Sequence, residues 1–352
     1  MSFKTFSLDQ LGWRSNYAQN LTLADFEAGY PARVTAVHRS GLSVLSSRGN
    51  GTVVLPPHFA DVEMAVAVGD WVMVDHDADR IIRLIERYSL IARVAAGGDH
   101  RRQSIAANLD TLFVVTSCND DLNPSRLERY LTLAFDAGVE PVVVLTKSDL
   151  SDHVDDYLAT AQHTLATVAI LAVNATDAAS VAQLTPWLEA GRTVAFVGSS
   201  GVGKSTLTNS LIGDPSQSIG GIRDDDAKGR HTTTAREMFP TLTGAWVIDT
   251  PGMRELRVGA AEAGLAVVFD DIEALAMACR FSDCQHGGDA GCAVGQAIAD
   301  GTLDARRFAN YQKLQREAAE AQRTVREKRE RSRQFGVMGK AAVRAKRERL
   351  DR

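Results

Sequence analysis

An apolar strand, a glycine-rich loop and the start of a helix follow one another in Thr193-Val-Ala-Phe-Val-Gly-Ser-Ser-Gly-Val-Gly-Lys-Ser-Thr-Leu-Thr-Asn-Ser-Leu-Ile212. A phosphate-binding loop requires this order, because glycines let backbone N–H groups wrap around phosphates and the helix N-terminus adds positive potential. We predict that Lys204 reaches the β- and γ-phosphates and that the Ser205 hydroxyl ligates Mg²⁺. The predicted phosphate-contacting residues are Gly198, Ser199, Ser200, Gly201, Val202, Gly203, Lys204, Ser205 and Thr206.

A second motif, Thr146-Lys147-Ser148-Asp149, follows another apolar strand and indicates which base is bound. A carboxylate offers only acceptors, whereas guanine presents two donors, its N1 proton and its 2-amino group. Adenine presents neither, so Asp149 would face it as a costly unpaired charge, and the motif predicts guanine. Lys147 is expected to lie along the base. Thr146 stands where such motifs usually have Asn and has fewer hydrogen-bonding groups, so we expect an effect on nucleotide affinity. Standing alone, the tetrapeptide would also suit a helix start capped by Ser148.

A third motif, Asp249-Thr-Pro-Gly252, ends a further apolar strand. It matches the DxxG element, in which Asp249 holds Mg²⁺ through water and the Gly252 amide meets the γ-phosphate. The alternative is an ordinary strand-to-turn junction. The first switch is expected in Gly229–Thr234, between the loop and this motif, and Thr233 would complete the Mg²⁺ shell there.

The residue that positions the attacking water is not in its usual place. Many GTPases carry Gln directly after DxxG, but this chain has Met253, which cannot orient water by hydrogen bonding. Slow basal hydrolysis is therefore expected, with water positioned by another residue when a partner docks. His231, inside the predicted first switch, is the candidate catalytic residue. The alternative is a surface histidine with no role.

The motifs occur in an unusual order, because the guanine motif precedes the phosphate-binding loop. Since both have the right local context, the order predicts a circularly permuted α/β G domain. Asn174 and Ala175 follow a strand after the guanine motif and form a candidate guanine-supporting loop. Continuous apolar strands between helical stretches predict a parallel sheet with ligands at the strands' carboxyl ends. The expected strands are Thr111–Thr116, Val142–Leu145, Val168–Val173, Val194–Val197 and Trp246–Ile248.

The N-terminal part predicts a separate, all-β domain. Five short strands with turn signals between them fit a small closed barrel, with the OB-fold as first choice. RNA binding and a purely structural role both stay open, because fold alone does not prove function. The expected domains are residues 1–94, a barrel with an N-terminal extension; 95–259, the G domain, beginning with a linker at Ala95–Asp99; and 260–352, a helical domain. The expected barrel strands are Ala32–Val37, Leu42–Ser46, Gly51–Leu55, Trp71–Val74 and Ile81–Ile85.

A metal site is predicted in the C-terminal part. Three of the four cysteines, Cys279, Cys284 and Cys292, lie in one short segment with His286. Three thiolates and one imidazole suit one tetrahedral Zn²⁺, and a complete protein ligand shell indicates a structural site. Scattered thiols are the alternative. Cys118 stands apart at the end of an apolar strand and is expected to be a small core residue.

Composition and charge place the chain among soluble globular proteins. Its 352 residues carry a formal net charge of -5, but residues 306–352 hold 16 of the 39 basic and 6 of the 44 acidic side chains. An acidic body with a basic tail indicates a polyanionic partner, or else a solvated helical face. No signal peptide or membrane-spanning run is visible, so a cytoplasmic monomer without membrane contact is expected.

The combined motifs resemble the RsgA (YjeQ/YloQ) family of circularly permuted GTPases. The resemblance covers about residues 30–315 and rests on TKSD, GSSGVGKS, GRHTTT, DTPG and the C-x4-C-x-H-x5-C ligand set, in that order. It implies an N-terminal OB-fold, a permuted G domain and a C-terminal zinc domain. It also implies binding to the 30S ribosomal subunit and its 16S rRNA, late subunit maturation, and hydrolysis of GTP to GDP that the subunit stimulates. The switch histidine implicated in the family corresponds to His231.

Three classes of function are left by the sequence. The first is a GTP hydrolase that acts as an assembly checkpoint on the ribosome and is released on hydrolysis. The second is a nucleotide-gated RNA-binding module whose hydrolysis is incidental, which the missing Gln keeps open. The third is a P-loop kinase acting on a small molecule, which the guanine and DxxG motifs disfavour.

Overall fold

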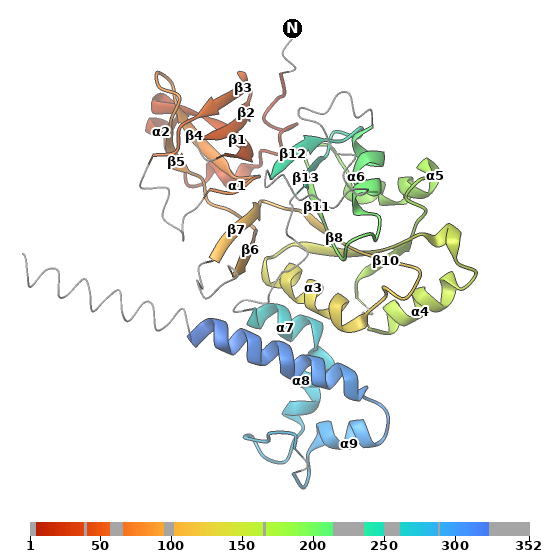
Figure 1. Cartoon of the computed structure of the whole chain (residues 1–352). Helices are drawn as coiled ribbons and strands as arrows, with labels where there is room; N and C mark the ends of the chain where they lie inside the picture. Colours follow the sequence, from red (N-terminus) through yellow and green to blue (C-terminus); the bar gives the residue numbers. More distant parts are fainter. Residues whose placement is uncertain are drawn as a thin grey trace, which may run out of the picture.

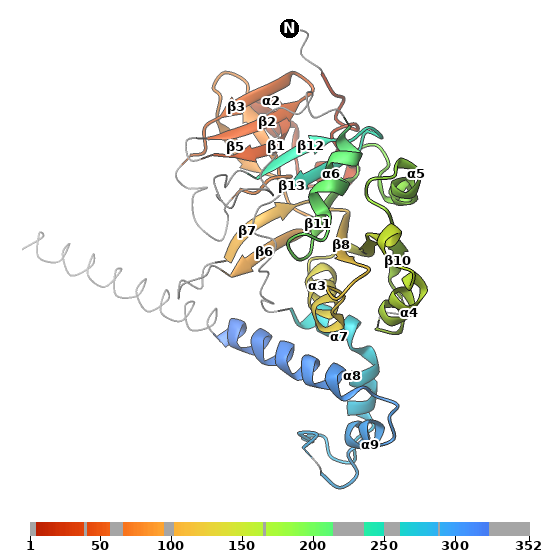
Figure 2. The same cartoon turned by 45° about the vertical axis from the view of Figure 1, so that its right-hand side comes forward.

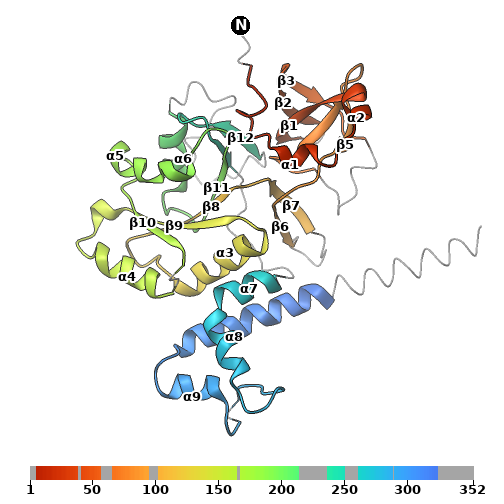
Figure 3. The ribbon, with the colours of Figure 1, turned by 180° about the vertical axis from the view of Figure 1, so that it is seen from behind.

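The computed structural model describes residues 5–38, 41–56, 66–94, 102–164, 167–213, 236–249, 261–287 and 289–323. In Figure 1 a set of N-terminal strands, a central sheet flanked by helices and a helical C-terminal lobe follow one another along the chain. The hairpin formed by β6 (Leu90–Val94) and β7 (Arg102–Ala107) lies between the N-terminal strands and the C-terminal lobe in every view (Figures 1 to 3). The N-terminal strands and the lobe therefore reach the central sheet from different sides.

The central sheet confirms the predicted parallel α/β core. In space its strands run β10-β9-β8-β11-β13-β12; the first five are parallel, and β12 is antiparallel to β13. The phosphate-loop strand β11 is central, and the chain order reverses between it and β8, which is where open α/β sheets bind ligands. The strands are β8 (Thr111–Ser117), β9 (Glu140–Thr146), β10 (Ala169–Ala172), β11 (Thr193–Val197), β12 (Glu237–Pro240) and β13 (Trp246–Asp249).

Helices cover both faces of this sheet. Alternate residues of β8 point to opposite faces, so Leu112 and Val114 belong to one apolar cluster and Phe113 and Val115 to another. The first cluster is completed by α3 and α4, and the second by α5, α6 and the 3₁₀ helix that follows α5. These helices are α3 (Pro124–Asp136), α4 (Val154–Thr164), α5 (Ala178–Val181), the 3₁₀ helix Ala182–Trp187 and α6 (Lys204–Ile212).

The five strands predicted near the N-terminus are confirmed within three residues at each end. Strand β1 pairs antiparallel with both β2 and β4, while β3 continues from β2 and β5 from β4. Their inward side chains form a third apolar cluster. Two short helices precede them, and the second begins with a capping box between Thr22 and Asp25. The elements are α1 (Ser15–Ala18), α2 (Leu23–Ala28), β1 (Gly29–Val37), β2 (Leu42–Ser46), β3 (Gly49–Val53), β4 (Trp71–Asp75) and β5 (Ile81–Leu84).

The N-terminal strands and the central sheet meet in one continuous ladder. Strand β1 pairs with β12 at Ala36 and Glu237, which joins the two sets of strands. The segment predicted as a linker, Ala95–Asp99, lies outside the described residues, and β6 and β7 pair antiparallel on either side of it. The sequence did not predict β6, β7 or β12.

Residues 5–21, here called the N-terminal strap, lie across this junction. Leu11 and Tyr17 are buried, and the Trp13 ring meets Trp71 of β4 edge-on at 4.8 Å. On the G-domain side, Trp246 Nε1 at the start of β13 donates to the Gln10 carbonyl at 2.7 Å. The strap therefore packs against the N-terminal strands and the G domain together.

The C-terminal lobe rests on α3. It contains α7 (Glu262–Val268), α8 (Asp270–Met277), α9 (Ala293–Ala299) and a long helix over residues 305–323, seen from behind in Figure 3. A Cβ on Gly264 of α7 would lie 2.0 Å from the Thr132 carbonyl, so only glycine lets α7 approach α3 this closely.

A buried carboxylate fastens the lobe to α3. The Glu128 side chain is fully buried and accepts hydrogen bonds from Arg306, Arg307 and Asn310 of the long helix. Arg306 and Arg307, the first two basic residues of the basic tail, are thus partners in internal ion pairs. Neither a polyanionic partner nor a solvated helical face, the two interpretations of the tail, predicted this. Residues 324–352, the rest of the basic tail, lie outside the described residues. Within the described ranges, no helix is long and apolar enough to cross a membrane.

Candidate nucleotide site and metal centre

A pocket opens at the carboxyl ends of the central strands, where the phosphate-binding loop meets the guanine motif. Its cavity volume is about 260 Å³, a little below the range of about 300–1,000 Å³ that small-molecule sites span. The structure thus brings together residues from three motifs that are separate in the sequence. The lining residues are Thr146, Lys147, Asp149, Leu150, Asn174, Ala175, Thr176, Gly201, Gly203, Lys204, Ser205 and Thr206.

The phosphate-binding loop has the backbone that its glycines allow. Gly198, Gly201 and Gly203 all have positive φ, and a Cβ on Gly198 would lie 2.0 Å from the Val115 carbonyl of β8. Helix α6 begins at Lys204, directly after Gly203. Lys204 Nζ donates to the carbonyls of Gly198 and Ser199, so this cation lies at the mouth of its own loop.

Thr146 links the guanine motif to the phosphate-binding loop. It is fully buried at the end of β9, and its hydroxyl lies 2.5 Å from the Val202 carbonyl and 3.1 Å from the Thr116 carbonyl of β8. Gly203 is favoured there by its φ of 93° rather than by this contact, since a Cβ on it would lie at an ordinary distance, 3.4 Å, from the Thr146 hydroxyl. The hydroxyl therefore braces two loops against each other, a role that the motif alone did not reveal.

Replacing Thr146 with Val is expected to weaken GTP binding by about 5- to 100-fold, because the Val202 carbonyl loses a buried donor worth about 1–3 kcal/mol. Nucleotide titration of the purified variants measures this change. Thr146→Ser keeps the hydroxyl and is the matched control, with affinity expected near that of the wild type. Equal affinities of the Val and Ser variants would contradict the bracing role.

The guanine motif turns sharply after β9. Lys147 has a φ of 59°, and a 3₁₀ turn over Ser148–Leu150 places the exposed Asp149 at the pocket. Two hydrogen bonds fix the neighbouring loop. The backbone N–H of Asn174 donates to Ser180 Oγ at 2.8 Å, and Ser210 Oγ donates to the Ala175 carbonyl at 2.8 Å. Ser210 belongs to α6, so the P-loop helix also supports the loop expected to hold the base.

Some predicted site residues are not among the lining residues. Asp249 ends β13 beside the phosphate-loop strand, but it does not line the pocket. Gly198, Ser199, Ser200 and Val202 belong to the phosphate-binding loop but are not lining residues, and Ser148 lies within its 3₁₀ turn. The predicted switch residues His231 and Thr233, together with Gly252, lie outside the described residues.

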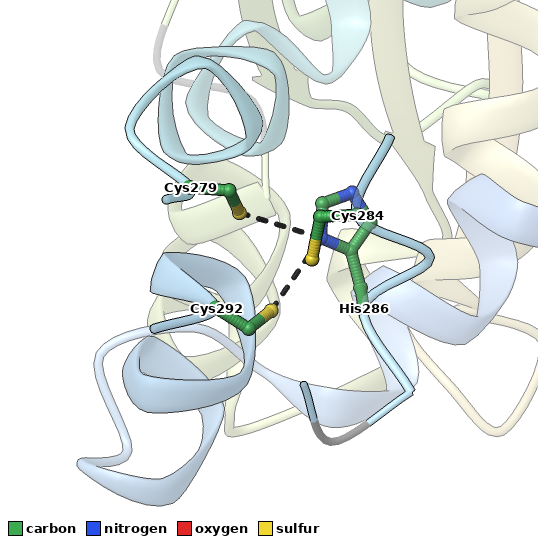
Figure 4. A group of neighbouring side chains, drawn as sticks. All are labelled: Cys279, Cys284, His286 and Cys292. Carbon is green, nitrogen blue, oxygen red and sulfur yellow. Dashed lines mark hydrogen bonds between the residues drawn. The ribbon is translucent and has the colours of Figure 1, made fainter. Parts of the chain in front are cut away.

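The Cys and His side chains of the C-terminal lobe converge on one point (Figure 4). The ligand atoms of Cys279, Cys284, His286 and Cys292 all lie within 4.8 Å of one another. His286 Nδ1 lies 3.6 Å from Cys279 Sγ and 3.5 Å from Cys292 Sγ. A tetrahedral zinc ion with ordinary bond lengths gives sulfur–nitrogen edges of about 3.5 Å. The donor set and its spacing therefore fit a metal ion.

One member of this metal-binding group also caps a helix. Cys292 is the N-cap of α9, and the Gly295 amide donates to its sulfur at 3.2 Å. The His286 ring meets Phe308 of the long helix edge-on at 5.9 Å, which ties the metal loop to that helix. Cys118 is buried in the core as predicted, and burial raises the pKa of its thiol.

Comparison with known proteins agrees with this geometry. The sequence profile described as RsgA GTPase matches residues 84–259. A relative from Vibrio vulnificus (strain CMCP6), the small ribosomal subunit biogenesis GTPase RsgA 2, is 51% identical over 96% of this chain and 95% of its own length. The chain belongs to the RsgA GTPase family. A further relative of this family, from Xanthomonas oryzae pv. oryzae (strain MAFF 311018), is 45% identical over 90% of this chain and 89% of its own.

Solved structures related to the RsgA family share the fold. YjeQ from Thermotoga maritima aligns over 82% of this chain and 98% of its own, with a TM-score of 0.59 and 23% identity. YloQ, described as a circularly permuted GTPase, aligns over 83% of this chain and 96% of its own, with a TM-score of 0.58 and 21% identity. As a member of the RsgA family, the chain is a GTPase.

Proposed function

We propose that this GTPase acts on the small (30S) ribosomal subunit late in its maturation, that the subunit stimulates GTP hydrolysis, and that hydrolysis releases the protein. One observation carries the guanine part of this proposal: Asp149 and Lys204, from motifs in permuted order, line a single pocket. The ribosomal part is supported by the relatives, which are named small ribosomal subunit biogenesis GTPases and match nearly the whole chain.

The proposed residue roles follow the pocket. Asp149 pairs with the guanine N1 proton and 2-amino group, and Lys147 lies along the base. Asn174 and Ala175 support the base, and residues Gly198–Thr206 surround the phosphates. Ser205, Thr233 and Asp249 are the proposed ligands of Mg²⁺, which would neutralise phosphate charge when bound with GTP. His231 is the proposed residue that orients the attacking water once the subunit has docked.

One structural zinc ion is the proposed occupant of the Cys279, Cys284, His286 and Cys292 group. Three thiolates and one imidazole form a complete ligand shell, which leaves no open position for a substrate. The proposed domain limits remain residues 1–94, 95–259 and 260–352. Strand β6 lies before the first limit and β7 lies after it, yet the two strands pair with each other. The position of this first limit therefore stays a prediction.

An OB-fold is the proposed identity of the N-terminal strands. Beyond the antiparallel ladders, an isolated parallel bridge joins Val54, just after β3, to Arg80, just before β5. This bridge supports closure of the five strands in the order β1-β2-β3-β5-β4. Such barrels commonly bind RNA, and 16S rRNA is the proposed partner of a monomeric protein.

The proposal is tested by measuring GTP turnover of the purified full chain, alone and with 30S subunits, with ATP and 50S subunits as controls. Stimulation of about 100-fold or more, confined to GTP and 30S, is expected, because a side chain positioned to exchange a proton with the reacting group typically contributes about 10²–10⁴-fold. His231→Ala should lose most of this stimulation. Slow turnover unaffected by 30S would instead favour a nucleotide-gated binding module, and equal use of ATP would favour a kinase.

A further inference from the structure

Arg33 lies at the point where the N-terminal strands, the strap and the G domain meet. It is on β1, and its side chain is 1% exposed. One terminal nitrogen donates to the Leu11 carbonyl of the strap, and the other donates to Thr193 Oγ1 at 2.6 Å and lies 3.5 Å from the Asn108 carbonyl. One side chain thus touches three segments that are far apart in the sequence.

The burial of this cation is costly. Its hydrogen bonds go to carbonyls and a hydroxyl rather than to a carboxylate, and Arg33 Nε has no hydrogen-bond partner among the described residues. The guanidinium lies 5.7 Å from the centre of the Trp71 ring. This cation–π contact offsets only a small part of the cost of burying the charge. Burial lowers the pKa of Arg33. Because an apolar side chain would fill such a site at lower cost, stability alone does not account for a cation here.

Thr193, the partner of Arg33, is the first residue of the phosphate-loop strand. Its amide donates to Asp110 Oδ2 at 2.7 Å, and its carbonyl accepts from the Asp110 amide at 2.8 Å. The strand β11 then runs without interruption to Gly198. Just before it, Gly191 contacts Gly12 of the strap so closely that a Cβ on Gly12 would lie 2.4 Å from the Gly191 carbonyl. A shift of β1 or of the strap therefore displaces the start of the strand that carries the phosphate-binding loop.

Strand β1 also contacts the central sheet at a second place. β1 pairs with β12 at Ala36 and Glu237, and β12 pairs along its length with β13. In the sequence, these two strands separate the predicted first switch, Gly229–Thr234, from Gly252 of the DxxG motif. Strand β1 thus contacts β11 through the Arg33 side chain and contacts β12 by edge pairing at Ala36.

We propose that Arg33 is a positioning residue through which the N-terminal β unit and the nucleotide pocket act on each other, by way of Thr193 and the β1–β12 ladder. Because such coupling is reciprocal, the state of the nucleotide must change the stability of β1, and a partner bound to the β unit must change hydrolysis. The second half of this inference rests on the proposed ribosomal function, whereas the first half does not.

The first half is tested by hydrogen exchange of the full chain, with GDP and with a non-hydrolysable GTP analogue. Amides of Tyr30–Val37 and of the strap are expected to exchange at rates that differ by about fivefold or more between the two nucleotides, the lower end of typical coupling. Thr193→Val removes the hydroxyl that accepts from Arg33 while the Leu11 and Asn108 carbonyls and the β1–β12 pairing remain, so it should reduce this difference. Thr193→Ser keeps the hydroxyl and should preserve it.

Each outcome decides the inference. If the amides of β1 and the strap in the wild-type protein exchange at equal rates with GDP and with the GTP analogue, the inference is overturned. This outcome holds even if Thr193→Val fails to fold. A difference that persists undiminished in a folded Thr193→Val variant also overturns it, because the contact between Arg33 and Thr193 would then be dispensable.

The second half is read from the ratio of 30S-stimulated to basal turnover, which should fall about fivefold or more in Thr193→Val but not in Thr193→Ser. An unchanged ratio in the folded Val variant overturns this half. If 30S subunits stimulate neither the wild type nor the variants while exchange still responds to nucleotide, the proposed ribosomal function fails and the coupling through Arg33 stands.

Discussion

Asp149→Asn is expected to reverse the base preference of the pocket, lowering GTP affinity by about 100-fold or more and allowing xanthosine triphosphate to bind. The Asn amide group places donors against the N1 proton and 2-amino group of guanine, and a site that loses such a match rejects its ligand by about 10²–10⁵-fold. Xanthine has a carbonyl oxygen in place of the 2-amino group, so the Asn amide nitrogen has an acceptor and its carbonyl accepts the N1 proton.

Competition binding of GTP and xanthosine triphosphate to the purified variant measures this reversal. Asp152→Asn is the matched control, because it makes the same chemical change at an exposed carboxylate that does not line the pocket. Asp152→Asn should bind GTP as the wild type does. If Asp149→Asn keeps its GTP affinity, Asp149 does not read the base, and the guanine assignment of the pocket fails with it.

Cys292→Ser is expected to abolish binding of the proposed zinc ion and to unfold the loop that carries the proposed ligands. A serine hydroxyl is not ionised at neutral pH and does not replace a thiolate in a closed tetrahedral shell. Serine is a good N-cap, so the variant should keep the hydrogen bond at the start of α9 that Cys292 now accepts. The variant therefore separates the effect of losing the metal from the effect of losing the cap. Because structural zinc contributes folding energy directly, stability of the lobe should fall by several kcal/mol.

Metal content per chain after gel filtration, together with thermal unfolding, measures this effect. The control is Cys118→Ala, which removes the one cysteine outside the group and should leave about one zinc per chain. Full zinc content in Cys292→Ser would exclude Cys292 from the ligand shell.

The sequence predicted the parts of the molecule that have a local pattern. The parallel strands were predictable because each is a continuous apolar run. The phosphate-binding loop at Gly198 was predictable because phosphate binding requires glycines at particular positions of the loop. Strand β12 (Glu237–Pro240) was not predicted, because it has four residues and ends in proline. The strap was missed as well, since Leu11, Trp13 and Tyr17 show no period and contact residues far away in the chain.

The buried polar contacts could not be predicted, because each depends on a partner that no local pattern reveals. Glu128 on a helix is typical of a solvated face, yet it is fully buried against Arg306, 178 residues later. Arg33 in a strand resembles any exposed cation until Thr193 is placed beside it. Thr146 was identified as a departure from the usual Asn, but its contact with the Val202 carbonyl became visible only when the two loops were placed together.

The attachment of the C-terminal lobe through Glu128 also has a consequence for synthesis. The α3 half of this contact is translated early, whereas its arginine partners come almost at the end of the described chain. Until they are made, the surface of α3 that will bury Glu128 stays open to water. The nucleotide pocket is complete in sequence well before that, so this contact between the G domain and the lobe forms only after Arg306, Arg307 and Asn310 have been made.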